Sequence, residues 1–360
     1  MSVLQFIWLP LSKDPIMISD YTVIGLNRQI DSKGDWISDT FEEQLVQPSR
    51  LRQNDLLVKI CGVSVNPVDT KRRYFKTSSS GFLVLGYDAS GIVVDVGTSV
   101  SRFKIGDEVF YAGQINRQGS NGEYHVVDQR IVGRKPSSLS HLEAASYPLV
   151  SLTAWEILVD CFHLEPFTSN PYDLLVIGGA GGVSSMVIQL AKSVFGMNVV
   201  ATSSRPESFS WVHSMGADDV INHRLPLDIQ LSDLHFSPRY VACLNHAASH
   251  FQPILKSILP FGHVAIIDEA VHVDTALFKQ KSVSLSWEYV FTKSLYQTND
   301  MLAQGQTLDL IADLIDRKKI CSITGNRFDY MNPINLQLAH ELQLSGQAIG
   351  KTVLGPWRAA

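Results

Sequence analysis

Residues 174–192, LLVIGGAGGVSSMVIQLAK, decide the fold of this chain. The apolar run Leu174–Ile177 is suited to a buried strand and leads through a glycine turn into a helix-like segment. Read from Gly179, the turn has the pattern GxGxxS, with Ser184 where a third glycine often stands. Such a turn lets a pyrophosphate approach the backbone at a helix start, where amides and dipole favour anions. The expected phosphate-binding residues are Gly179, Ala180, Gly181, Gly182 and Val183.

The segments after residue 152 alternate between strand-like and helix-like patterns, which predicts a parallel sheet covered on both faces. Before residue 150, short β-like runs separated by turn residues predict a compact, largely antiparallel barrel. The expected barrel strands include 56–60, 91–96, 108–111 and 123–127; the parallel sheet has strands at 174–177, 198–202, 219–221, 240–244 and 262–267, with helices at 182–195, 206–215 and 250–258. A strand at 282–290, a helix at 300–319 and a strand at 348–354 complete the prediction.

Composition narrows the class of protein. The chain has 360 residues, 45% hydrophobic and 18% charged, which is typical of a globular protein with about two domains. A formal charge of -5 gives no reason to expect nucleic acid or a membrane as partner. Four widely spaced cysteines form no CxxC pair, so we expect reduced thiols and a cytoplasmic location. Residues 1–16 are interpreted as a loose extension, because Met17 begins a more natural first strand.

The order of several segments resembles the medium-chain dehydrogenase/reductase superfamily, in its zinc-free quinone-oxidoreductase-like branch, often labelled zinc-type alcohol dehydrogenase-like. The segments are GVSVNPVDTKRR (62–73), LGYDASGIVVDVGTSVSRFKIGDEVF (85–110), AASYPLVSLTAWEIL (144–158), the glycine turn and MGADDVIN (215–222). The resemblance implies a GroES-like catalytic domain over 17–151, a Rossmann domain over 152–290 and a return to the catalytic domain over 291–360. It also implies hydride transfer with a nicotinamide cofactor in the cleft between the domains.

The chain departs from zinc-dependent relatives at their ligand positions. Where those relatives carry cysteine, histidine–glutamate and cysteine, this chain has Asn66, Tyr87-Asp88 and, approximately, Leu149. Such side chains cannot build a zinc site of nitrogen and thiolate ligands. His246 and His250 have a spacing that suits a metal, but NHAASH is interpreted as a loop near the nicotinamide. We therefore expect no metal.

The end of the second parallel strand predicts which nicotinamide cofactor binds. Sites that prefer NAD usually place an acid there, whereas this chain has Ser203, Ser204 and Arg205. Two hydroxyls and a guanidinium suit a 2′-phosphate, so the expected cofactor is NADPH. The alternative is a solvated arginine before a helix. His223 flanks the adenosine or is a surface histidine.

At the nicotinamide end, the resemblance implies four further contacts. Thr153 is expected to cap the helix that links the domains and to touch the nicotinamide phosphate. Asn245 is a cofactor neighbour, and the backbones of Ile266 and Ile267 lie near the carboxamide.

Without zinc, hydrogen-bond donors must polarise the hydride acceptor. Asn66 carries a suitable amide, although Asn-Pro is also a common turn. Lys71 is a candidate proton donor or orients cofactor hydroxyls, and the alternative is a solvated lysine. Asp69 is expected to orient neighbours, and Tyr87 to line the pocket or belong to the core.

The expected function is NADPH-dependent reduction of a quinone or α,β-unsaturated carbonyl compound, a small-molecule substrate. The alternatives are a zinc-dependent alcohol dehydrogenase and a non-catalytic NADPH-binding protein. A homodimer is expected through the strand 282–290, which can pair with its copy across a twofold axis.

Overall fold

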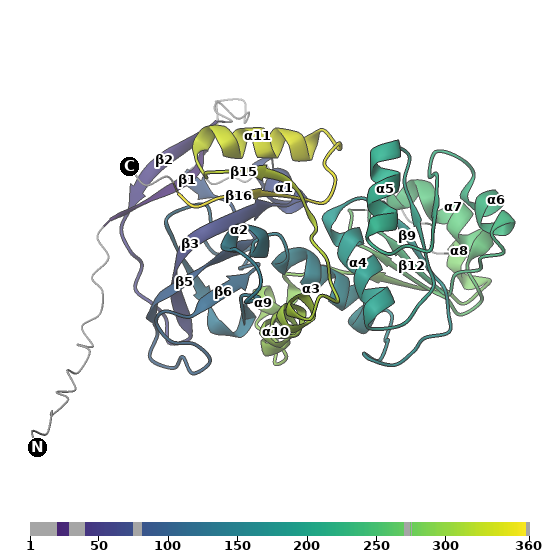
Figure 1. The fold of residues 1–360 in the computed structure, drawn as a ribbon, viewed down its shortest axis with the longest axis horizontal. Coiled ribbons are helices and arrows are strands. Elements are labelled where there is room, and N and C mark those ends of the chain that lie inside the picture. The colour runs from purple at the N-terminus through teal and green to yellow at the C-terminus, as the bar shows by residue number, and fades with distance from the viewer. Residues whose placement is uncertain (1–19, 29–39, 75–80, 270–273, 275, 358–360) are drawn as a thin grey trace, which may run out of the picture.

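The computed structural model describes residues 20–28, 40–74, 81–269, 274 and 276–357. The proposed extension, residues 1–16, lies outside these ranges. Two bodies lie side by side, one built on antiparallel sheets and one on a parallel sheet (Figure 1). The first and the last described strands both lie in the antiparallel body, and the parallel body is formed by the middle of the sequence.

The antiparallel body contains two sheets. The smaller has the order β2-β1-β4, and the larger has the order β15-β16-β3-β5-β6-β8, with β7 also paired to β3. Within the larger sheet only β15 and β16 are parallel. The strands are β1 (Tyr21–Arg28), β2 (Phe41–Val46), β3 (Asp55–Val65), β4 (Gly81–Val84), β5 (Ala89–Val96), β6 (Glu108–Tyr111), β7 (Tyr124–Asp128), β8 (Val132–Arg134), β15 (Thr324–Phe328) and β16 (Lys351–Leu354).

The parallel sheet has the order β11-β10-β9-β12-β13-β14, which is the doubly wound arrangement of a Rossmann domain. Its strand order reverses between β9 and β12, so a crevice is expected beyond their carboxyl ends. The strands are β9 (Leu174–Ile177), β10 (Val199–Thr202), β11 (Asp219–Ile221), β12 (Tyr240–Cys243), β13 (His263–Ile266) and β14 (Ser284–Trp287). The helices are α4 (Gly182–Ser193), α5 (Pro206–Ser214), α6 (Leu227–Asp233), α7 (Ala247–Ser257) and α8 (Ala276–Lys279).

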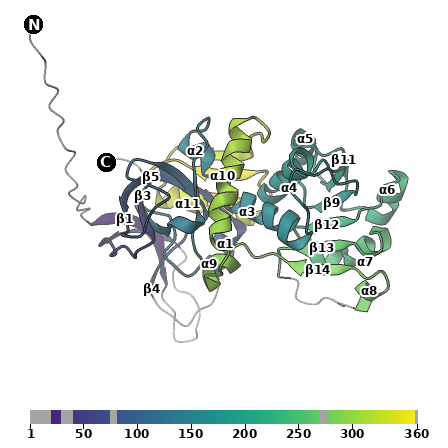
Figure 2. The same cartoon turned by 90° about the horizontal axis from the view of Figure 1, so that it is seen from below.

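The remaining helices belong to the antiparallel body or lie between the two bodies, as Figure 2 shows for α3 and α10. They are α1 (Pro67–Tyr74), α2 (His141–Ala144), α3 (Pro148–Glu156), α9 (Thr292–Tyr296), α10 (Leu302–Asp316) and α11 (Pro333–Leu344), with a 3₁₀ turn at Gln129–Ile131 and a π-helical turn at Ile157–Cys161.

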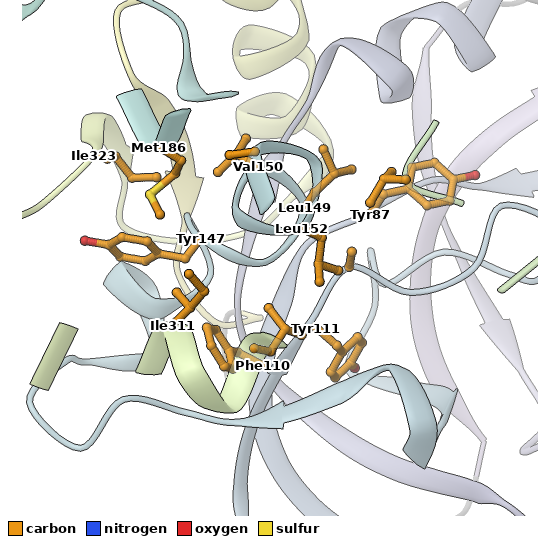
Figure 3. Close-up of a cluster of buried hydrophobic side chains, with 14 of the residues drawn as sticks. Tyr87, Phe110, Tyr111, Tyr147, Leu149, Val150, Leu152, Met186, Ile311 and Ile323 are labelled. Carbon is orange, nitrogen blue, oxygen red and sulfur yellow. The ribbon is translucent and has the colours of Figure 1, made fainter. Parts of the chain in front are cut away.

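Helix α3 joins the two bodies because it is apolar on nearly all sides and almost entirely buried. Leu149 and Val150 of α3 lie in one continuous apolar cluster with Met186 of α4 and Ile311 of α10 (Figure 3). A shared core of this kind holds the two bodies against each other, so the space between them has a defined shape.

The predicted fold class is confirmed, and most predicted elements agree with the structure to within a few residues. The strand predicted at 282–290 is shorter, as β14. Several elements of the structure were not predicted, among them helices α6 and α11 and strands β2, β4 and β15. Helix α6 is short and buries only Leu227 and Leu231, which is too weak an apolar pattern to recognise in sequence. No helix among the residues described has the length and apolarity of a membrane-spanning segment.

Candidate active site

A cleft of about 1530 Å³ runs along the carboxyl ends of the parallel strands and is closed on its other side by α1, α3 and the loop before β16. It lies at the predicted switch point between β9 and β12. Most of the residues singled out from sequence line it: Asn66, Lys71, Thr153, Ala180, Gly181, Gly182, Val183, Ser203, Ser204, Arg205, His223, Asn245 and Ile267.

Four predicted residues do not line the cleft. Gly179 faces β10, where an added Cβ would stand 2.8 Å from the Thr202 carbonyl oxygen. Ile266 is fully buried within β13. Tyr87 is buried behind the cleft wall and packs edge-on against Phe291, which does line the cleft. The fourth residue, Asp69, is buried outside the cleft and bonded to the backbone.

The Asp69 carboxyl fastens the start of α1. It accepts hydrogen bonds from the backbone N–H of Asn66 (2.8 Å) and of Gly86 (2.9 Å). Burial raises the pKa of Asp69 to about 7, against the opposing effect of these hydrogen bonds. Asp69 thus fixes the backbone of its neighbours from outside the cleft.

The glycine turn is shaped to receive a phosphate. Gly178 has φ of +86°, a conformation that glycine adopts without strain. Gly181 is the N-cap of α4 and no side chain caps the helix, so the first amides of α4 have no side-chain acceptor. A Cβ on Gly181 would meet nothing closer than the Ser184 hydroxyl at 3.5 Å, so space is open above the turn. These features fit the pyrophosphate of a nicotinamide dinucleotide.

Ser184 replaces the third glycine of the pattern without opening the turn. Its one hydroxyl proton lies between the carbonyl oxygens of Gly178 (2.8 Å from Oγ) and Gly181 (3.0 Å), and the residue is buried. The serine therefore holds the turn closed where a glycine would only leave room for it.

The end of the cleft next to β10 and β11, called the far end below, is lined by hydroxyl and guanidinium groups. Ser203 shares a hydrogen bond with Ser208, and the Arg205 guanidinium donates to the Gln347 carbonyl at 3.2 Å. Arg224 lines the same end and was not singled out from sequence. His223 lies beside it; burial, with the charge of Arg224, lowers the pKa of His223. Two arginines and a serine hydroxyl suit a phosphate group.

The domain junction holds a buried network centred on Lys351, a residue that was not singled out from sequence. The Lys351 ammonium donates to the carbonyl oxygen of Val65 (3.0 Å), to the Asp88 carboxylate (3.0 Å) and to the side-chain oxygen of Asn66. Its three donors thus meet three acceptors. The side chains of Lys351 and Asp88 are 4% and 0% exposed, so this ion pair is shielded from solvent.

Asn66 is held rigidly by this network. Its amide N–H donates to Asp88 at 2.7 Å, while its oxygen accepts from Lys351. Asp88 accepts further bonds from the Ser64 hydroxyl (2.8 Å) and the Leu149 backbone N–H (2.7 Å). The second N–H of the Asn66 amide takes no part in the network; Asn66 borders the cleft and is itself fully buried.

This network occupies the positions where zinc-dependent relatives are expected to hold metal ligands. Asn66, Asp88 and Leu149 are brought together, and the cation among them is the Lys351 ammonium. Over the ranges described, no group of three or more histidine, cysteine, aspartate or glutamate side chains is arranged to hold a metal ion.

Lys71 lies at the mouth of the cleft. Its ammonium is 3.3 Å from the Glu269 carboxylate; the Lys71 side chain is about half exposed and that of Glu269 is largely exposed. Such an exposed pair stabilises little. Lys71 therefore stays available to a ligand that enters the cleft.

Thr153 lies within the buried wall of the cleft and does not cap a helix, because α3 already begins at Pro148. Beside it stands Glu288, which sequence reasoning missed, as it missed Arg224 and Lys351. The available signals were weak: Glu288 is the one acid in the alternating segment SVSLSWEYV, and Lys351 follows a glycine at the start of the last strand.

The sequence matches two protein-family models, one in each of the two bodies. Residues 52–142 match the family model of the alcohol dehydrogenase GroES-like domain, and residues 182–304 match that of the zinc-binding dehydrogenases. The chain is 38% identical over 306 residues to a zinc-type alcohol dehydrogenase-like protein of Staphylococcus aureus (strain Mu50 / ATCC 700699), across 84% of this chain and 90% of the relative. It is 42% identical over 184 residues to 2-methylene-furan-3-one reductase of Solanum lycopersicum, across 48% and 46% of the two chains.

Solved structures show the same fold. A Rhizobium etli CFN 42 protein, described as a proposed zinc-dependent alcohol dehydrogenase, superposes with a TM-score of 0.87 at 38% identity, over 95% of this chain and 99% of that one. The quinone oxidoreductase of Escherichia coli, solved in complex with NADPH, superposes with a TM-score of 0.74 at 21% identity, over 93% and 100% of the two chains.

Proposed function

Because the chain belongs to the medium-chain dehydrogenase/reductase superfamily, among its zinc-type alcohol dehydrogenase-like proteins, we propose that it is an NADPH-dependent reductase of quinones or α,β-unsaturated carbonyl compounds that acts without zinc. The observation that carries this proposal is the buried Lys351–Asp88–Asn66 network, which places hydrogen-bonded side chains where a zinc enzyme needs nitrogen and thiolate ligands. The similarity to a reductase named for a conjugated enone supports the substrate class.

NADPH is the proposed cofactor because of the charge at the far end of the cleft. Arg205 and Arg224 both line that end, beside the buried Ser203. A 2′-phosphate would gain charge-assisted hydrogen bonds there, whereas NADH would leave two guanidinium groups without an anion.

When bound, NADPH supplies the hydride, and the protein has to position and polarise the acceptor. The free N–H of Asn66 is the proposed donor to the acceptor oxygen, where negative charge develops. Lys351 and Asp88 keep that amide in one orientation, so it needs no rearrangement during the reaction. Lys71, at the open side of the cleft, is the proposed source of the proton.

The direct test is the oxidation of NADPH by the purified protein, with a panel of quinones and enones and with NADH in parallel. We expect turnover with NADPH well above NADH, unchanged by a metal chelator. Turnover that requires zinc would favour an alcohol dehydrogenase instead. NADPH binding without oxidation by any acceptor would favour a non-catalytic binding protein.

We also propose a cytoplasmic homodimer. All four cysteines are unpaired, which suits a reducing compartment. Strand β14 is an edge of the parallel sheet and offers its outer side to a second copy.

A further inference from the structure

Glu288 is a buried carboxyl in the cleft wall that the proposed reaction does not use. It follows β14, at the carboxyl edge of the parallel sheet, and is 7% exposed. Its neighbours Trp287 and Tyr289 are about half exposed, so the alternation turns Glu288 inward. The Glu288 carboxyl is buried on the wall of the cleft and faces a second buried carboxyl, that of Glu156. Two buried carboxyls side by side are unusual and are typical of a functional site.

The groups around Glu288 come from α3, the turn after it, and α9. Glu288 lies within hydrogen-bonding reach of the Thr153 hydroxyl and the Glu156 carboxylate, both on α3. The Lys293 ammonium of α9 is 3.2 Å from Glu156 and 2.5 Å from the half-exposed Asp160. The Cys161 thiol also faces Glu288, and burial raises the pKa of Cys161 to about 12, so it stays neutral.

The charges around Glu288 favour its protonated form. Among the described residues, the Lys293 ammonium is the cation that contacts these carboxyls, at Glu156 and Asp160. Burial raises the pKa of Glu288 well above its usual range, and the neighbouring Glu156 raises it further. Two buried carboxyls that face each other beside a single ammonium favour a proton shared between them, close to the cleft.

We propose that Glu288 is a catalytic residue that releases its proton when the positively charged NADP⁺ is bound and keeps it when the uncharged dihydronicotinamide of NADPH is bound. This inference rests on the proposed nicotinamide cofactor. Loss of the hydride leaves one positive charge on the nicotinamide, and ionisation of Glu288 supplies one negative charge beside it. The charge within the buried wall then stays constant during hydride transfer, which lowers the cost of forming a cation there.

The proposed exit for the proton is Glu156 and then the half-exposed Asp160, which the Lys293 ammonium joins to Glu156. The overall reaction consumes one proton at the acceptor, and Glu288 regains its own from solvent when NADP⁺ leaves. Atoms and charge therefore balance over a turnover without any further reactant.

The test measures the number of protons released when each nucleotide binds and does not depend on enzymatic turnover. Titration calorimetry of NADP⁺ and NADPH binding, in buffers of different ionisation enthalpy, gives the protons released by each nucleotide. We expect NADP⁺ to release up to about one proton more than NADPH near neutral pH. Proton changes caused by the 2′-phosphate, including those at His223, are common to both nucleotides and cancel in the difference.

Glu288→Gln is the decisive variant, because glutamine mimics the protonated acid and should preserve the fold. It should abolish the difference in proton release, while the matched surface variant Glu341→Gln should keep it. In the unmodified protein, the ratio of the two dissociation constants should shift with pH in favour of NADP⁺ as pH rises, by up to about tenfold per unit. In Glu288→Gln this ratio should not change with pH.

Each outcome separates the two proposals. Equal proton release by the two nucleotides, or an unchanged difference in Glu288→Gln, would overturn the role of Glu288 and leave the reductase proposal standing. A difference that depends on Glu288, in a protein that reduces no acceptor, would support this inference and overturn the reductase. If neither nucleotide binds, both proposals fail.

Discussion

Among single residues, Lys351 shows most clearly how a buried charge is made acceptable. Its ammonium has lost nearly all contact with water, yet each of its donors has an acceptor within the protein. The pair with Asp88 is weak support for stability as such, because two charges had to be desolvated. Its value lies in fixing the orientation of Asn66.

Removing that ammonium should be costly. Lys351→Met leaves the Asp88 carboxylate buried without its cation, and we expect a loss of about 3–5 kcal/mol in the free energy of unfolding, measured in urea. The exposed Lys319→Met serves as the control and should change little. Adding Asp88→Asn to Lys351→Met should recover part of the loss. A Lys351→Met protein as stable as the parent would show that the network carries no buried charge.

Arg205 should decide between the two nicotinamide cofactors. Arg205→Ala removes one guanidinium from the proposed 2′-phosphate site, and a charged hydrogen bond of this kind is worth about 1.5–3 kcal/mol. The dissociation constant of NADPH should therefore rise by roughly 10–100-fold, while that of NADH stays nearly unchanged. Fluorescence titration measures both. An equal loss for the two nucleotides would assign Arg205 a structural role.

At the level of elements, the turn between β9 and α4 separates two tasks that the glycine pattern alone does not distinguish. Gly178 is needed for its backbone conformation, since φ is +86°. Gly181 has φ of −80° and open space around it, so its missing side chain matters only to whatever binds there. One glycine builds the turn, and the other leaves room for the ligand.

A matched pair of alanine variants tests this division. Gly178→Ala should cost about 1–2 kcal/mol in unfolding free energy, because alanine is strained at positive φ. Gly181→Ala should unfold at nearly the parent's urea concentration but bind NADPH at least about tenfold more weakly, because a Cβ would stand where the phosphates approach. The opposite pattern, a stable Gly178→Ala with a destabilised Gly181→Ala, would contradict the geometry of the turn.

For the molecule as a whole, the shared core through α3 holds two bodies so that one cleft lies between them, and each body contributes half of the site. The last strand, β16, returns to the antiparallel sheet beside β3 and carries Lys351 to Asn66. The far side of the parallel sheet ends at β14, whose outer edge is unpaired within the described chain. The proposed dimer would extend the sheet at that edge.

Size-exclusion chromatography with light scattering checks the oligomeric state. We expect a dimer at micromolar concentration. In β14, the N–H of Ser284 already binds the Gly262 carbonyl oxygen, so the alternation points the N–H of Leu285 away from β13. Leu285→Pro removes that outer donor and should shift the protein towards monomer. A monomeric parent protein would refute the dimer.

Much of the fold and of the candidate dinucleotide site can be predicted from local sequence patterns. The apolar strand before the glycine turn, the alternation of strands and helices, and the serines and arginine after β10 act through neighbouring residues, so their positions in the cleft are predictable. The position of Asn66 in the cleft is predictable in the same way, because Asn66 is the first residue after strand β3.

The partners of those residues were decided only by tertiary structure. Lys351 meets Asn66, and Glu288 meets Glu156, because the chain returns across the domain junction after a long detour in sequence. Asp69 and Tyr87 lie outside the cleft for the same reason. Packing against distant segments determines which side chains of a short element are buried and which line the cleft. Local patterns fix helices, strands and turns through short-range sterics and hydrogen bonds. Which charges are buried together depends on long-range contacts that no local pattern records.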